Sequence, residues 1–244
     1  DDKNEKKTYY HPKNIYKGSI LDRNGHILAG SLSTFSIYAH PEKIKNKKFV
    51  FEKLANILKN KSKEDIFKKI SSDKAFVWIA RHVAPEKKKM IDFLGIEGLS
   101  FQKSVKRIYP YKRLFSHIIG LTDIDQKGLF GLEISLERII ENDQKDIFTS
   151  LDVRFQSIVY DELLKQMTFF NAPAANSILC HAKTGEVLAM VSFPDFSPND
   201  TRTHNAANFF NRNITGSYEF GSIMKVYNVA LFLENKVGSL KSIF

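Results

Sequence analysis

The sequence of 244 residues has a single cysteine, Cys180, so no disulfide can form within the chain. Cys180 follows two apolar residues, and we expect it to be a small core residue. The chain has no apolar run of membrane-spanning length and no signal peptide. Its polar start at Asp1 is typical of a linker or of the cut end of a longer chain.

Patterns typical of metal and nucleotide sites are also missing. The seven histidines are dispersed without metal-ligand spacing, and no cysteine pair accompanies them. The glycines form no phosphate-binding loop. We therefore expect no metal and no cofactor.

The formal net charge of +10 is distributed unevenly. Residues 150–244 carry eight basic and eight acidic side chains, which leaves 29 basic and 19 acidic ones for residues 1–149. This asymmetry predicts two domains, 1–149 and 150–244. The basic half could face nucleic acid, anionic lipid or an acidic polymer. Most of the excess is lysine scattered over predicted helix surfaces such as residues 43–74, which favours a solvated surface and argues against nucleic acid.

Local signals in the first half alternate between strands and short helices. Asn24-Gly25 predicts a hairpin turn between two strands within residues 16–29. Pro41 opens a basic helical region, and Ser62 with Asp65 predicts a helix start. A further helix is expected to start at Pro85, and strands are expected at residues 34–39, 75–80 and 104–109. The helical region after Pro41 should have an apolar face formed by Phe51, Leu54, Ala55 and Leu58.

The second half begins like a separate unit. Asp152 is a suitable N-cap for a helix. Residues 177–181 and 186–191 predict a hairpin around residues 182–185, and the whole sequence indicates an α+β fold. The apolar residues expected to face inward from the helix are Phe155, Ile158, Val159, Leu163 and Met167.

Residues 221–225 carry the strongest indication of chemistry. Gly221-Ser222 is followed by Lys225 at the head of an apolar helical pattern that stops before Gly238. If the helix begins at about Ser222, the hydroxyl lies at its positive end and Lys225 lies one turn further on the same face. Ser222 is therefore the candidate nucleophile, and Lys225 the candidate base. Ser71 with Lys74 and Ser100 with Lys103 share this spacing, but lack the glycine and the long apolar helix.

Seven stretches in order along the chain support this interpretation. The first, Lys17 to Ala29, matches Arg-Gly-x-Ile-x-Asp-Arg-Asn-Gly-x-x-Leu-Ala with lysine for the first arginine, and the last, Tyr218 to Ser222, matches Tyr-Glu-Pro-Gly-Ser with phenylalanine for proline. Between them lie residues 107–110, 117–120, 128–133, 184–190 and 194–199. The series resembles the signatures of the class B penicillin-binding proteins, the monofunctional D,D-transpeptidases of bacterial cell-wall synthesis.

This resemblance implies an elongated non-catalytic pedestal, residues 1–149, followed by the first part of a penicillin-recognising transpeptidase domain, residues 150–244. It implies a peptidoglycan D,D-transpeptidase that forms an acyl-enzyme on Ser222 with Lys225 as base. The substrate would be the wall stem peptide, with β-lactams as inhibitors. The expected location is the periplasmic face of a bacterial inner membrane, with an anchor outside this chain. Partners would be division or elongation membrane proteins, including a glycosyltransferase. Residues 120–125 favour the division branch.

Two triplets resemble later motifs of the superfamily but stand in the wrong order. Residues 183–185 read Lys-Thr-Gly and residues 197–199 read Ser-Pro-Asn, yet both precede Ser222. Neither motif follows Lys225 in this sequence, so the substrate-binding residues stay unknown. We expect this chain to be the N-terminal part of a longer protein and to be inactive alone. Two alternatives stay open: a non-catalytic interaction module of the division or elongation machinery, and a basic nucleic-acid-binding protein.

Overall fold

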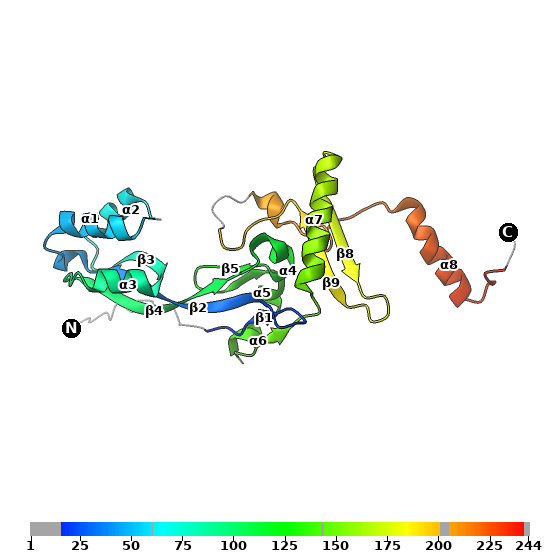
Figure 1. Ribbon diagram of the computed structural model, residues 1–244, viewed down its shortest axis with the longest axis horizontal. Coiled ribbons are helices and arrows are strands. Elements are labelled where there is room, and N and C mark those ends of the chain that lie inside the picture. Colours follow the sequence, from blue (N-terminus) through cyan, green and yellow to red (C-terminus); the bar gives the residue numbers. More distant parts are fainter. Residues whose placement is uncertain (1–15, 60, 143, 201–204, 242–244) are drawn as a thin grey trace, which may run out of the picture.

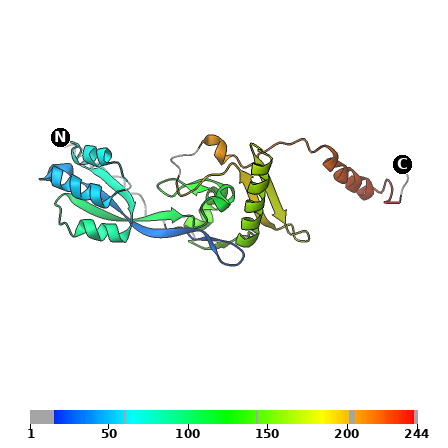
Figure 2. The ribbon, with the colours of Figure 1, turned by 45° about the horizontal axis from the view of Figure 1, so that its top comes forward.

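The computed structural model describes residues 16–59, 61–142, 144–200 and 205–241. The described chain is elongated (Figures 1 and 2), with a helix-covered sheet at one end and helix α8, Lys225–Glu234, at the other. Helix α7, Val153–Phe169, crosses between them. No helix within these ranges is both long and apolar enough to cross a bilayer.

The main sheet has five strands in the order β3-β2-β1-β7, with β4 also paired to β2. The hairpin turn predicted at Asn24-Gly25 connects β1 to β2, and Gly25 has a φ of 88°, which suits glycine. The prediction of a separate strand at residues 34–39 is wrong, because β2 continues from Ile27 and pairs without a break with β4 from Gly30 to Ala39. The strands are β1 Ile20–Leu21, β2 Ile27–Ala39, β3 Val77–Val83, β4 Leu99–Ile108 and β7 Ile147–Phe148.

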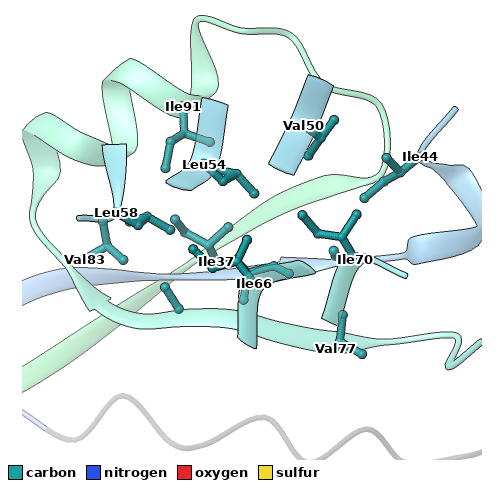
Figure 3. Packing of buried hydrophobic residues seen from close by; sticks show 13 residues of the cluster. Ile37, Ile44, Val50, Leu54, Leu58, Ile66, Ile70, Val77, Val83 and Ile91 are labelled. Carbon is teal, nitrogen blue, oxygen red and sulfur yellow. The ribbon is translucent and has the colours of Figure 1, made fainter. Parts of the chain in front are cut away.

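Three helices cover one face of β2, β3 and β4 and form with them the head, residues 34–105. Asn46 and Ser62 cap the first two helices by accepting the backbone N–H groups of Phe49 and Asp65. Val50 is buried in the core, where Phe51 was expected. Phe51 is only partly buried and packs against the edge of this core. Figure 3 shows the resulting head core between the helices and the sheet. The helical elements are η1 Pro41–Lys43, α1 Lys47–Ile57, α2 Lys63–Ile70 and α3 Pro85–Asp92.

A second core, the junction core, joins the two halves of the sequence. Ile20 and Leu28 of the first half pack in it with Leu151 and Phe196 of the second half. Phe196 is fully buried against the rings of Phe130 and Phe209. The surrounding elements are η2 Lys112–Phe115, α4 Ser116–Ile119, β5 Leu121–Thr122, β6 Gly128–Phe130, α5 Gly131–Ser135, α6 Glu137–Asn142 and η3 Ala206–Phe209.

The second half begins with α7 packed on a hairpin of β8, Ala175–Cys180, and β9, Val187–Phe193. Asp152 caps α7 as predicted. The predicted inward face is partly wrong, because Phe155 and Ile158 are exposed. Gln156 is fully buried instead, and its amide donates to the carbonyls of Leu114 and Met190 while its oxygen accepts from the Met190 N–H.

The expectation of a buried Cys180 is also wrong. Its thiol is exposed at the end of β8. Successive side chains of a strand point to opposite faces, and in β8 only the face of Ser177 and Leu179 is partly covered. Ile178 and Cys180 point to the other face, on which they are exposed.

Candidate active site

The predicted nucleophile and base lie on consecutive short elements. Ser222 is the second residue of η4, Gly221–Met224, and Lys225 is the first residue of α8. The helix therefore begins as a tighter 3₁₀ turn at Gly221, where an α-helix was expected to start at about Ser222. A 3₁₀ helix has three residues per turn, so residues 222 and 225 lie on the same face. The backbone geometry thus agrees with the predicted pairing of the two residues on one face.

Gly221 supplies the approach to the serine. Its φ of 53° lies in the left-handed region, and a Cβ added to it would meet no atom within 4 Å. Any substitution at this position would be strained by the backbone even though space is available. The space around Gly221 is open, and Ser222 next to it is exposed.

Both candidate residues are exposed. The Lys225 backbone N–H donates to the Ser222 carbonyl, but no hydrogen bond joins the two side chains within the part of the chain that is described. The apolar residues around them are exposed as well. Val226 and Tyr227, for example, are 70% and 62% exposed. A lysine serves as a base when its amine is partly removed from water. The described residues do not shield the Lys225 amine from water. Ser222 and Lys225 thus have the spacing that acyl transfer requires, but not the desolvated surroundings.

Side chains of the second half tether the serine segment to the β8–β9 hairpin. The hydroxyl of Tyr218 donates to the Arg212 carbonyl at 3.1 Å and to Asn176 Oδ1 at 3.3 Å. Asn213 donates to the Val191 carbonyl at 2.7 Å and accepts from Asn176 Nδ2 at 3.0 Å. Sequence reasoning missed the role of the Asn176 and Asn213 side chains, since their partners lie 22 or more residues away in the chain.

The two out-of-order triplets have local structural roles. Thr184 lies in the turn between β8 and β9, where its hydroxyl contacts His181 Nδ1 at 3.0 Å. Asn199 bridges both backbone groups of Tyr109, accepting from the N–H and donating to the carbonyl. Ser71 caps the end of α2, and Ser100 lies on β4 in the head, so neither belongs to the segment around Ser222. No cluster of three or more His, Cys, Asp or Glu side chains among the described residues could hold a metal ion.

The early signature stretches, which are far apart in sequence, meet beneath the head. Arg107 pairs with Glu133 at 2.7 Å, and both side chains are almost fully buried. Arg107 also donates to the Gly18 carbonyl at 2.8 Å. Lys17, which takes the place of the usual arginine, is buried and pairs with Glu137 at 3.2 Å. Breaking the buried Arg107–Glu133 pair is expected to be strongly destabilising, since the remaining charge would lose its partner.

The Asp22 turn connects the first half to the start of α7. Burial of Asp22 opposes its ionisation, but hydrogen bonds from the backbone and ring of His26 and from the N–H groups of Val153 and Asn24 outweigh it and lower the pKa of Asp22 to about 2. Asn24 also donates to Asp152 Oδ2 at 3.1 Å. Hydrogen bonds from Arg154 hold the pKa of Asp152 well below its usual range despite burial. The turn thus fixes the end of α7 that leads from one half to the other.

Comparisons with known families agree with this architecture. Residues 13–151, more than half of the chain, match the penicillin-binding protein dimerisation domain. Residues 177–244, which include Ser222 and Lys225, match the penicillin-binding protein transpeptidase domain. The mixed α and β fold therefore combines a dimerisation domain with sequence of a transpeptidase domain.

Several curated relatives are similar over nearly all of the chain. The probable peptidoglycan D,D-transpeptidase PenA of Neisseria meningitidis is 32% identical over 255 residues, covering 89% of this chain and 43% of the relative. The peptidoglycan D,D-transpeptidase FtsI of Escherichia coli is 30% identical over 253 residues, covering 91% and 43%. The probable peptidoglycan D,D-transpeptidase FtsI of Caulobacter vibrioides is 31% identical, covering 93% and 39%. The chain spans less than half the length of these relatives. It belongs to the class B penicillin-binding proteins.

Proposed function

We propose that this chain carries the nucleophile of a peptidoglycan D,D-transpeptidase. The observation that supports it most is Ser222 in a 3₁₀ turn directly before Lys225, within the segment that matches the transpeptidase domain. In the proposed reaction Ser222 Oγ attacks the carbonyl between the last two residues of a stem peptide. Its proton passes to the Lys225 amine and then to the departing amine of the terminal residue.

The resulting acyl-enzyme is resolved by a second stem peptide. Its amine attacks the ester carbonyl, forms the cross-link and returns the proton to Ser222 Oγ. The Ser222 N–H, at the positive end of the helix, would supply part of the oxyanion hole. A β-lactam would acylate the same oxygen, with ring opening in place of a leaving group. Glu219 is proposed to order the loop before the serine and not to react.

We propose that the two halves of the chain, which differ in net charge, also differ in role. Residues 1–149 would be a pedestal that binds membrane proteins of the cell-division machinery, including a glycosyltransferase, and residues 150–244 would belong to the catalytic domain. The head supports this role, because it has its own core and lies at the opposite end of the described chain from α8. The proposed location is the periplasmic face of the inner membrane.

The 244-residue chain alone is proposed to be inactive. Within it no Ser-x-Asn or Lys-Thr-Gly element follows Lys225, so nothing is available to orient the leaving group or hold the substrate carboxylate. Catalytic groups that act as a unit lose several orders of magnitude in rate when members are missing. Exposure of Ser222 and Lys225 is consistent with this proposal.

The test is the mass of the whole gene product after incubation with benzylpenicillin. The unchanged protein should gain one covalent penicilloyl group, and Ser222→Ala should gain none. Ser71→Ala and Ser100→Ala are matched controls, because each removes a hydroxyl three residues before a lysine. Both controls should keep the adduct. An adduct that persists in Ser222→Ala would refute the assignment.

A further inference from the structure

A cavity of about 430 Å³ lies where the head meets the junction core. Its wall is built from Lys61 before α2, the end of β3, the inner end of β4, the turn after β5 and residues 198–200. None of its lining residues belongs to the segment around Ser222.

Hydrogen bonds fix the shape of this cavity. The turn after β5 is held against β3 by Arg81, which pairs with Asp125 at 2.7 Å, and by His82, whose Nε2 lies 3.2 Å from the Ile124 carbonyl. The same turn is held against β4 by Gln126, which donates to the Val105 carbonyl at 3.0 Å. The head and the turn thus line a preformed space that is open to solvent.

Four lining residues are basic and two are acidic, and two of the basic ones, Arg81 and Arg107, are ion-paired with Asp125 and Glu133. Lys61 and Lys106 line it, and neither ammonium group has an ion-pair or hydrogen-bond partner within the described ranges. The acidic wall residues are Asp123 and Asp200. Asp123 already accepts two backbone N–H groups of its own turn, at 2.8 and 2.9 Å.

Two arginine donors beside the cavity are buried and unpartnered. Arg81 Nε and Arg107 Nη2 have no hydrogen-bond acceptor within the structure described, and Arg107 is only 4% exposed. Buried polar groups are nearly always paired, so each such donor requires an explanation. Burial lowers the pKa of the adjoining His82, the hydrogen bond to the Ile124 carbonyl partly opposes this, and the charges of Arg81 and Lys106 lower the pKa further. The wall therefore favours an anion.

We propose that this cavity binds a carboxylate-bearing ligand. The lysine ammonium groups at Lys61 and Lys106 donate to its oxygens, and the guanidinium groups of Arg81 and Arg107 stabilise its charge from the wall. A carboxylate of this kind can come from a free small polycarboxylate or from the acidic side chains of a peptide segment. The proposal is independent of acylation at Ser222.

The test is isothermal titration of the 244-residue chain with citrate and, separately, with a hexaglutamate peptide. Lys106→Glu reverses a charge in the cavity wall, and should weaken binding of whichever compound binds by about tenfold or more. Lys103→Glu is the matched control, because it makes the same charge change on the same strand, at an exposed residue outside the cavity. The control should change the affinity by less than about twofold.

The pattern of binding distinguishes the two sources. Binding of citrate alone identifies a free small carboxylate, and tighter binding of hexaglutamate identifies an acidic peptide segment. Absence of binding by both compounds overturns the proposal. Equal weakening by Lys106→Glu and Lys103→Glu also overturns it, because the attraction would then come from net charge and not from the cavity. Circular dichroism of both variants confirms that the fold is retained.

Discussion

The head and the serine helix follow similar apolar patterns but differ completely in burial. Leu54 on α1 is fully buried, whereas Leu231 on α8 is 56% exposed. The head closes its core with three helices on one sheet, all within residues 34–105. Helix α8 makes its contacts mainly with η4, which precedes it directly. In both regions the spacing of the apolar residues predicts the helix. Whether the apolar face is buried depends on which other elements pack against it.

Glu133→Ala should have the largest effect, because it breaks the buried pair that joins the early signature stretches. Arg107 would keep its charge without a carboxylate partner, and the expected loss in the free energy of unfolding is about 3–5 kcal/mol. Urea denaturation followed by circular dichroism measures it. Glu52→Ala, at an exposed position on α1, is the control and should change stability by about 0.5 kcal/mol or less. Equal losses in the two variants would contradict the structure.

A pair of matched leucine substitutions tests the comparison directly. Leu54→Ala should destabilise the head by about 2–5 kcal/mol, because it leaves a cavity in a closed core. Leu231→Ala removes the same atoms from the exposed helix and should cost about 0.5 kcal/mol or less. Trp78, the single tryptophan, lies on β3 and reports unfolding of the head by fluorescence. A Leu231→Ala loss as large as that of Leu54→Ala would show that α8 is buried in solution.

Acid stability should depend on the Asp22 turn. The pKa of Asp22 is lowered to about 2, so its ionised form stabilises the fold above its ordinary pKa of 3.8, and that contribution is lost as the pH falls towards 2. Asp22→Asn should lower the free energy of unfolding by about 1–3 kcal/mol at neutral pH. It should also flatten the dependence of stability on pH between about 4 and 2. Asp73→Asn, at an exposed position, should leave this pH dependence unchanged.

Tyr218→Phe should have the smallest effect. It removes only the hydroxyl that contacts Arg212 and Asn176, and the expected cost is about 0.5–1.5 kcal/mol, confined to the serine segment. Limited proteolysis should therefore cut the segment between Gly216 and Ser222 faster in the variant, while the head is cut at an unchanged rate. An unchanged cleavage rate in the serine segment would show that this tether is not needed.

The sequence predicted the features that depend on local chemistry. The turn at Asn24-Gly25 and the caps at Ser62 and Asp152 are confirmed, because each involves residues within a few positions of one another. The family resemblance is confirmed by the matched domains. The pairing of Ser222 with Lys225 as nucleophile and base stays a prediction.

Features that depend on distant contacts could not be predicted. Phe196 completes a core whose other members come mainly from the first half, and no local pattern indicates this. Gln156 can be buried because its amide hydrogen-bonds to the carbonyls of Leu114 and Met190. A search for apolar residues at helical spacing does not identify such a polar residue as part of the core. Cys180 follows apolar residues but points to the uncovered face of β8. In each case, burial depended on whether a segment far away in the chain covers the residue.

Hydrogen exchange of the 244-residue chain, followed by mass spectrometry, tests the contrast between the two regions most directly. Backbone amides open locally with free energies that follow their burial and contacts. We expect peptides from α1 and the strands of the head to be protected for far longer than peptides from α8. Protection of α8 equal to that of α1 would contradict the account, because the serine helix would then have its cover within this chain.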